Sequence, residues 1–365
     1  MDFYTTHISK KAHKHISKVL KTTFISAGKL AEEFEEKLAK DLGLINPVSL
    51  NSGTSALHLG LVLADIKPGD EVILPPQTFV ASGLSILMQG ATPVFADIQY
   101  QTGNLDPKTI KHKITERTKA IMPVHWAGYP CDMDEINAIA KEHGLAVIED
   151  AAHALGATYK EKPIGSISRF TAFSFQAIKH LTTGDGGALC CLSAQDQAQA
   201  KAKRWFGIDR NNSKPSILGE REYDLQELGF KYHLNDLAAA LGIANLEDLP
   251  RILKRRRKIA KLYRKELKDI SGLELLKYEN DRESAYWLFT VLVDNRERFI
   301  KALKAAGIPT SVVHLRIDKN SIFKGMAPDL TEQAKFNTKQ LSIPLHSALT
   351  DDDVALIIRT IKKGW

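Results

Sequence analysis

Cysteine is scarce in this chain of 365 residues, and the three present, Cys131 with the adjacent Cys190 and Cys191, fit neither a disulfide framework nor a zinc knuckle. We therefore expect small core residues in a reducing compartment, and we predict no metal site. No apolar run approaches the roughly 20 residues that span a bilayer. The N-terminal stretch MDFYTTHISKKAHKHISKVL lacks the apolar core of a secretory signal. These absences predict a cytoplasmic protein with no membrane partner.

Base-stacking aromatic residues are missing from the most basic run of the chain, Lys254–Lys258. The formal net charge of +7 favours anionic partners in general. Without interleaved aromatics, however, the run is more typical of a solvated helix face than of a nucleic-acid site, and we predict no nucleic-acid partner. No G-x-G-x-x-G motif follows the first expected strand, so a Rossmann-type nicotinamide or flavin site is unsupported.

Apolar strand-like runs alternate with amphipathic helical patterns over most of the chain. Runs such as EVIL and LAVIED, separated by helices, predict an α/β fold with a mostly parallel sheet covered by helices on both faces. We divide the chain into a large domain, 1–245, and a smaller C-terminal α+β domain, 246–365, with the N-terminal helices as candidates to pack on the small domain. Strands are expected at Tyr286–Val293 and Pro309–His314, and a loop at Asn211–Glu222.

Polar and aromatic residues follow several of the expected strands, at the edge where ligands collect in open α/β sheets. They are Asn51–Ser55, Pro76–Phe79, His125-Trp126 and Asp150–His153. After Asn51 the chain turns at Gly53 and a helix opens at Thr54 and Ser55. Free N–H groups at a helix start form an anion site, although Ser and Thr also cap helices for purely structural reasons. We expect these segments to converge.

Lys179 lies between two short apolar runs, in TAFSFQAIKHLTTGDGGALCCL. The surrounding small and turn-forming residues favour a tight, buried turn, and burial lowers the pKa of a lysine amine. Such an amine forms Schiff bases with carbonyl compounds, including pyridoxal phosphate (PLP). Ser174, five positions upstream, joins Thr54 and Ser55 as a candidate phosphate donor. The alternative is a surface lysine beside a Gly-rich turn.

Three further residues suit the same cofactor. Asp150 ends a buried strand, where a carboxylate needs a cationic partner such as the pyridinium nitrogen of PLP; it could instead cap the next helix. His153 could lie against the cofactor ring or its phenolic oxygen, or be a satisfied core histidine. Phe79 could stack on the ring or pack in the core.

The order and spacing of these segments resemble the DegT/DnrJ/StrS family of PLP-dependent sugar aminotransferases, which has the aspartate aminotransferase (type I) fold. The resemblance covers nearly the whole chain, through NSGTSALHLGL, PPQTFVAS, VIEDAAHALGA, FSFQAIKHLTTGDGGAL and GFKYHLNDLAAALGIANL. It implies that Lys179 carries the cofactor, that Asp150 partners the ring nitrogen and that His153 and Phe79 flank the ring. It implies further that the phosphate is bound by Thr54, Ser55 and Ser174.

The resemblance also implies a homodimer with its active site between the subunits. Where many members reach the neighbouring phosphate with an Asn, this chain has Lys231, and it has Ser168-Arg169 where an Asp is expected. The implied reaction moves an amino group from L-glutamate to a nucleotide-linked 4-keto-6-deoxysugar, in amino sugar biosynthesis for a surface polysaccharide or a glycosylated metabolite. The alternatives are a carbocyclic (inosose-type) ketone as acceptor, a PLP-dependent dehydratase, a non-catalytic PLP-binding regulator, and a plain α/β scaffold. His314 and Arg316, in HLRIDKN, are either an anion-contacting segment or a charged surface loop.

Overall fold

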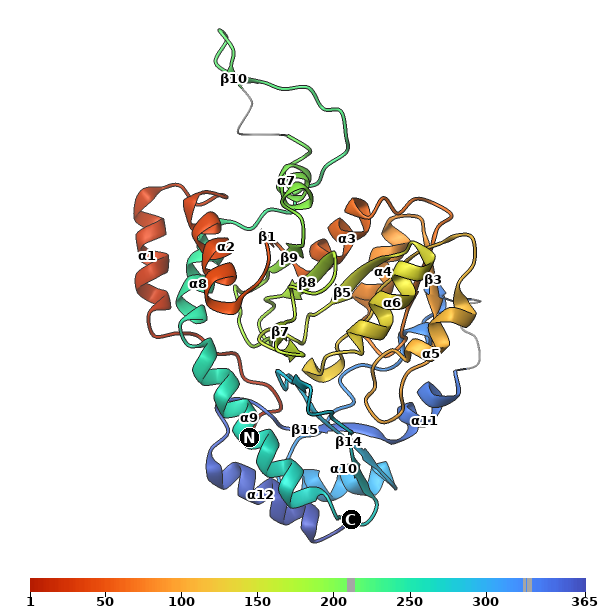
Figure 1. The fold of residues 1–365 in the computed structure, drawn as a ribbon. Coiled ribbons are helices and arrows are strands. Elements are labelled where there is room, and N and C mark those ends of the chain that lie inside the picture. The colour runs from red at the N-terminus through yellow and green to blue at the C-terminus, as the bar shows by residue number, and fades with distance from the viewer. Residues whose placement is uncertain (209–213, 324–325, 327–329) are drawn as a thin grey trace.

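A seven-stranded sheet forms the centre of the computed structural model, which describes residues 1–208, 214–323, 326 and 330–365 (Figure 1). In spatial order its strands are β1 (Pro47–Leu50), β9 (Gly187–Cys191), β8 (Phe170–Ser174), β5 (Ala146–Asp150), β4 (Thr118–Ile121), β2 (Glu71–Leu74) and β3 (Thr92–Phe95). The strands from β8 to β3 pair in parallel, and only β9 runs antiparallel to its neighbours. The mostly parallel sheet predicted from the sequence is confirmed.

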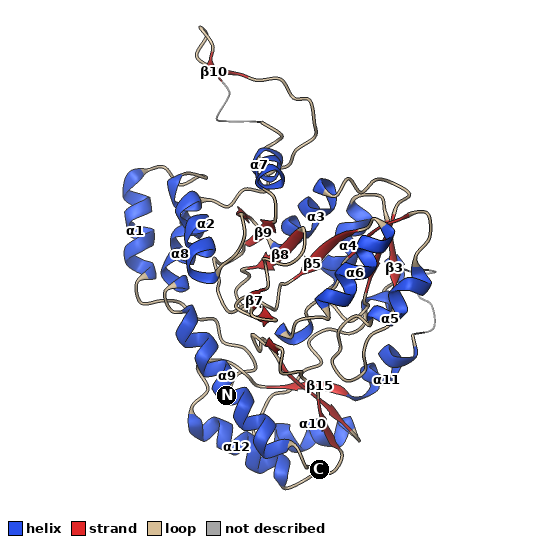
Figure 2. Cartoon of the chain, viewed as in Figure 1, coloured by secondary structure: helices blue, strands red, loops and turns tan. Residues whose placement is uncertain are grey.

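Both faces of this sheet are buried because successive strand residues point to opposite sides. In β2, Val72 and Leu74 pack on one side and Ile73 on the other. The first side is covered by α3 (Gly53–Leu63), α4 (Val80–Met88) and α7 (Ala194–Lys203). The second side is covered by α2 (Lys29–Leu42), α6 (Met133–His143) and α8 (Asp236–Leu246), as Figure 2 shows in blue around the red strands.

The N-terminal helices pack on the large sheet's side of the molecule. Helix α1 (Ala12–Thr22) and α2 both lie against α8. Helix α2 ends at Gly43, whose φ of 68° provides the left-handed C-cap that the sequence predicts. The residues before α1 reach the C-terminal part instead, where the Asp2 carbonyl lies 3.1 Å from Nε2 of His346.

A second, antiparallel sheet holds the C-terminal part together. Its strands are β12 (Leu273–Leu275), β14 (Phe289–Val293) and β15 (Gln340–Ile343), packed on α9 (Leu249–Leu267), α10 (Arg296–Ala305) and α12 (Asp351–Lys362). Helix α11 (Thr331–Lys339) leads into β15. Only Glu247 and Asp248 separate α8 from α9, so the division at residue 245 has no linker and stays a prediction.

Two strand predictions are wrong in this part. The strand expected at Tyr286–Val293 begins only at Phe289, because Tyr286 has a left-handed backbone with φ of 52°. The strand expected at Pro309–His314 forms only one bridge, between Ser311 and Ser342.

Short elements connect the two parts. They are β6 (Thr158–Tyr159) with β7 (Lys162–Pro163) and β13 (Arg282–Glu283), which form a small sheet, while α5 (Pro107–Ile110) packs beside α6 in the large part. Of the loop expected at Asn211–Glu222, residues 211–213 lie outside the described part. The remainder holds the hairpin β10 (Lys214–Pro215) and β11 (Arg221–Glu222), which projects far from the body in Figure 1.

The three cysteines are buried and free, as expected from the sequence. Across the described residues, we find no helix with the length and apolar character needed to traverse a membrane.

Candidate active site

Lys179 lies in the turn between β8 and β9, at the carboxyl edge of the central sheet. The turn is closed by the Phe175 N–H, which donates to the Gly186 carbonyl at 2.8 Å, and by the Thr183 N–H, which donates to the Phe175 carbonyl at 3.0 Å. Thr182 adds a hydroxyl bond of 3.0 Å to the same Phe175 carbonyl. Small and hydroxyl residues therefore fold the Gly-rich stretch back on itself and direct Lys179 towards the ends of β5 and β8.

The Lys179 amine is poorly hydrated and lies 3.8 Å from the centroid of the Trp287 ring. Loss of water lowers the pKa of Lys179 from 10.5 to about 7, and the nearby Asp150 carboxylate partly offsets this. A large fraction of the side chain is therefore neutral near pH 7. A neutral amine at the edge of a parallel sheet is a nucleophile and a proton carrier.

Asp150 ends β5 and is 6% exposed. The hydroxyl of Ser82 donates to its Oδ2 at 2.6 Å, and the N–H of Ala152 donates to its Oδ1 at 3.1 Å. Ser82 lies in the first turn of α4, so this bond ties the strand end to the helix that Phe79 opens. A buried carboxylate held by neutral donors is suited to a cationic partner.

His153 and Phe79 lie on the same side of the site as Lys179. His153 is 4% exposed, its ring stacks on Trp287 at 3.8 Å between centroids, and burial places its pKa well below the usual range. Its Nδ1 is buried and has no hydrogen-bond partner within the described part of the chain. Phe79 is 54% exposed, with its ring 5.2 Å from that of His314. Phe79 is therefore not a core residue, and His153 is buried with one ring nitrogen unpaired among the described residues.

The start of α3 and the end of β8 meet at one point. A Cβ added to Gly53 would lie 2.9 Å from Cβ and 3.3 Å from Oγ of Ser174, so the glycine allows this approach. Ser52 caps α3 by accepting from the Ser55 N–H at 3.0 Å, and the Ser55 hydroxyl donates to Oδ1 of Asn51 at 2.6 Å. The N–H groups of the first helical turn, where Thr54 lies, have no intrahelical acceptor. Those of them that Ser52 does not engage are suited to bind an anion.

Lys231 is not brought into this cluster. Its side chain is exposed, and its carbonyl accepts from Nδ2 of Asn51 at 3.2 Å. The following residue, Tyr232, accepts from the Asn51 N–H at 2.7 Å. Lys231 therefore borders the start of α3 on the outside of the subunit.

Four residues of the site were not identified from the sequence: Ser52, Ser82, Trp287 and, as a ring neighbour of His153, His314. His314 stacks 5.8 Å from His153, and burial with the nearby Lys179 lowers its pKa to about 4. The departure at Ser168-Arg169 is structural, because the Arg169 guanidinium binds both carboxylate oxygens of Asp196 at 2.9 and 3.0 Å.

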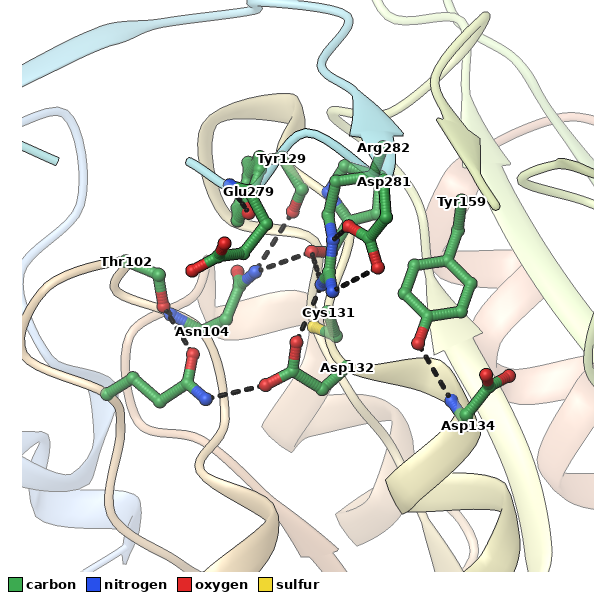
Figure 3. Close-up of polar contacts among 12 residues, drawn as sticks. Thr102, Asn104, Tyr129, Cys131, Asp132, Asp134, Tyr159, Glu279, Asp281 and Arg282 are labelled. Carbon is green, nitrogen blue, oxygen red and sulfur yellow. Dashed lines mark hydrogen bonds and ion pairs between the residues drawn. The ribbon is translucent and has the colours of Figure 1, made fainter. Parts of the chain in front are cut away.

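A polar network joins the loop that follows β4 to the C-terminal part (Figure 3). The Arg282 side chain is 5% exposed and donates to Asp132 Oδ1 at 2.7 Å and to Asp281 Oδ1 at 2.7 Å. Its guanidinium also lies 4.6 Å from the Tyr159 ring centroid. The Tyr129 hydroxyl accepts from the Glu279 N–H at 2.7 Å. These bonds fix residues 278–283 against the loop that follows β4.

PLP fits these residues. Among the described residues the buried Nδ1 of His153 has no partner and the Asp150 carboxylate is held only by neutral donors, while the α3 start offers N–H groups to a phosphate. The amine of Lys179 is available to bind an aldehyde carbon.

The comparisons with known proteins agree with this chemistry. The model of the DegT/DnrJ/EryC1/StrS aminotransferase family matches residues 6–362. A GDP-perosamine synthase of Caulobacter vibrioides is 36% identical over 95% of this chain and 93% of its own length. The sugar aminotransferase CalS13 of Micromonospora echinospora is 34% identical, with a TM-score of 0.95 over 100% of both chains. A Streptococcus pneumoniae protein solved in its PLP form is 30% identical, with a TM-score of 0.91 over 100% of this chain and 98% of that one.

Proposed function

The chain belongs to the DegT/DnrJ/EryC1/StrS aminotransferase family, and on that premise we propose that it transfers an amino group from L-glutamate to a nucleotide-linked 4-keto-6-deoxysugar. It is a PLP-dependent sugar aminotransferase. The observation that carries the proposal is the position of the Lys179 amine, which lies over the Trp287 ring on which His153 stacks, with the Asp150 carboxylate nearby. The product would be an amino sugar for a surface polysaccharide or a glycosylated metabolite.

Each predicted residue has a defined role in this proposal. The phosphate would be held at the start of α3, by Thr54 and Ser55, and by Ser174. Asp150 would hold the ring nitrogen in its protonated form, His153 would bond to the ring's phenolic oxygen through Nδ1, and Phe79 would cover the ring face. When bound, PLP supplies an electrophilic carbon for amines and an electron sink for the carbanion.

Lys179 transfers protons as general base and general acid in both halves of the reaction. Once freed by the amino donor, its neutral amine would take the α-proton of glutamate as a general base and, as a general acid, would deliver it to the cofactor's C4′ carbon. In the second half it moves a proton in the opposite direction while the keto-sugar is aminated. A pKa of about 7 suits both directions, because the two protonation states are then populated near neutral pH.

We propose a homodimer in which each subunit contributes to the other's site. The projecting hairpin and the residues that follow it bear large apolar side chains that a lone subunit leaves in water: Ile217, Leu218 and Leu228 are 101%, 83% and 77% exposed. Exposed apolar residues gathered on one segment are typical of an interface. Lys231 follows this segment, so pairing would bring its amine towards a neighbouring phosphate. The cytoplasmic location predicted from the sequence stays a prediction.

The first experiment is the visible spectrum of the purified protein before and after L-glutamate is added. We expect the absorption band of lysine-bound PLP, and we expect glutamate to bleach it. Lys179→Ala should lack the lysine-bound band and lose several orders of magnitude in kcat, since the covalent and proton-transfer roles vanish together. Near wild-type turnover of that variant would contradict the mechanism. A band that ignores glutamate would exclude this donor.

The acceptor is tested next, with the glutamate-treated protein and a panel of ketones. Return of the visible band on adding a nucleotide-linked 4-keto-6-deoxysugar, with no response to an inosose, supports the proposed acceptor. The reverse pattern would favour a carbocyclic ketone. Loss of water from the sugar without amine transfer would indicate a dehydratase.

Mixed dimers test the shared site. Lys179→Ala and Lys231→Glu, each inactive alone, are denatured together and refolded. Random pairing would give back about a quarter of the wild-type activity, because half of the mixed dimers' sites carry both native lysines. No recovery, with mixed dimers shown to form, would mean that Lys231 does not act in the partner's site.

A further inference from the structure

Trp287 is the side chain that touches the most parts of the lysine site. It is 1% exposed, and its indole N–H donates to the Ile178 carbonyl at 3.1 Å. Its ring lies 3.8 Å from Nζ of Lys179 and stacks on His153 at 3.8 Å with an interplanar angle of 16°. One indole therefore contacts the reactive amine, the peptide bond that leads into it and the histidine beside it.

A second bond ties the other side of the lysine to the same segment. Nε2 of His180 lies 2.9 Å from the carbonyl of Ala285. The residues before and after Lys179 are thus both bonded to the stretch Ala285–Trp287. The lysine turn has two attachments to the C-terminal part of the chain, one on each side of the reactive amine.

The backbone of this stretch is itself held firmly. The Trp287 N–H donates to the Ala127 carbonyl at 2.9 Å, and the buried guanidinium of Arg256 donates to the Trp287 carbonyl at 3.2 Å. Ala127 and Tyr286 have left-handed backbones, with φ of 57° and 52°. A Cβ on Gly128 would lie 3.1 Å from the Trp287 nitrogen, so a glycine is needed where the two segments meet. Left-handed residues of this kind persist where the surroundings enforce them.

We propose that Trp287 is a positioning residue, which holds the Lys179 amine and the His153 ring in the geometry that proton transfer needs. The proposal rests on the proposed role of Lys179. A lysine side chain has four rotatable bonds, and its amine must alternate between a bond to the cofactor and a proton-transfer position. The Trp287 ring, packed against one side of the Lys179 amine, restricts the positions that the freed amine can adopt. A displacement of about 1 Å in such a site costs about a hundredfold in rate.

The chain offers a matched control for this residue. Trp126 is another fully buried tryptophan of the same cluster, with its ring centroid 5.9 Å from that of His153. Its indole nitrogen has no hydrogen-bond partner among the residues that the structure describes. Trp126→Phe thus removes an unused N–H, whereas Trp287→Phe removes the one that holds the Ile178 carbonyl. Trp287→Leu removes the ring face as well.

The first readout uses cofactor-free protein, in which the pH dependence of Lys179 labelling by formaldehyde and cyanoborohydride is followed by peptide mass spectrometry. We expect wild type and Trp126→Phe to share one midpoint. In Trp287→Leu water reaches the amine, so its pKa should rise and the midpoint should move up by more than about one pH unit. The titratable groups that face the amine, Asp150, His153, His180 and His314, are unchanged in every variant.

The second readout uses the holoenzyme. We expect kcat to fall about tenfold in Trp287→Phe and up to about a hundredfold in Trp287→Leu, with KM for L-glutamate within twofold of wild type. The visible circular dichroism of the bound cofactor should weaken in the same order, and Trp126→Phe should match wild type in all three measurements.

Two results would overturn the proposal. One is that Trp287→Phe and Trp287→Leu match Trp126→Phe in labelling and in kcat. The other is that KM rises while kcat is unchanged, since that would make Trp287 a substrate contact. If Trp287→Leu does not fold, Trp287→Phe decides by the same criteria. Activity of Lys179→Ala would instead contradict the proposed function, and the labelling profile of the cofactor-free protein would still report where the amine lies.

Discussion

Replacing Lys179 by Met is expected to stabilise the cofactor-free protein. Met keeps most of the side chain's volume and has no charge to hydrate. The fall in the Lys179 pKa from 10.5 to about 7 corresponds to roughly 4–5 kcal/mol, at about 1.36 kcal/mol per pKa unit. The side chain is only half-buried, so water screens part of this cost, and we expect a gain in the free energy of unfolding of roughly 2–4 kcal/mol at pH 6.

The gain should depend on pH with a definite sign. Below pH 7 the folded and unfolded chains both carry the Lys179 proton, and the cost of burying the ammonium is fully present. Between pH 7 and pH 10.5 only the unfolded chain holds this proton, so the stability of the lysine protein rises with pH. The advantage of the Met variant should therefore shrink by about 2 kcal/mol between pH 6 and pH 9.

Urea unfolding of both cofactor-free proteins at pH 6 and pH 9 measures these differences. The control is Lys261→Met, on the exposed side of α9, where the lysine is hydrated in both states and the difference should not change with pH. The reasoning is refuted if Lys179→Met is destabilising at pH 6, or if its advantage is the same at both pH values.

Three other substitutions test the rest of the site. Asp150→Asn should lower kcat by roughly 10²–10³, because an amide does not hold a cationic ring nitrogen. The rate at which L-glutamate bleaches the visible band measures this loss. A fall of less than threefold would contradict the proposed role of Asp150. Arg282→Met leaves the partly exposed carboxylates of Asp132 and Asp281 without their cation and should cost roughly 1.5–3 kcal/mol in urea unfolding, whereas a neutral result would mean that the network is not stabilising. Gly128→Ala places a Cβ 2.6 Å from the His153 carbonyl oxygen at a φ of 92°, and a melting temperature equal to that of the wild type would show that the two segments can separate at no cost.

The central sheet could be predicted because its signal is local. Each strand of the parallel part is a short apolar run between helical patterns. Because helices cover both faces of the sheet, strand residues such as Val72 are apolar on either face, and the run is visible in the sequence alone. The strand expected at Pro309–His314 does not form, because a strand there depends on pairing with a distant segment and not on the local pattern. Its alternating pattern is compatible with a strand, but only Ser311 finds a partner on β15.

The site could be predicted as far as it lies at strand ends. Lys179, Asp150 and Ser174 follow apolar runs, and parallel strands bring such ends to one edge. Trp287 could not be found in this way. Its neighbours in sequence form an apolar run that reads as one strand, and the left-handed backbone of Tyr286 that redirects it depends on contacts with Ala127 and Gly128. Nothing near Trp287 in the sequence records those contacts.

The segment HLRIDKN shows how tertiary pairing decides between two interpretations of one charge pattern. Arg316 was a candidate to contact an anion, but its Nε and Nη2 donate to the two carboxylate oxygens of Asp318 at 2.7 and 2.6 Å, and both residues are buried. A guanidinium whose fork is already filled by a carboxylate is not free to bind a diphosphate. His314, two residues earlier, turns the other way and stacks beside His153 as a neutral ring. The segment therefore contributes an aromatic face to the site, and Arg316 adds no free cation for the negative charge of the proposed nucleotide-linked acceptor.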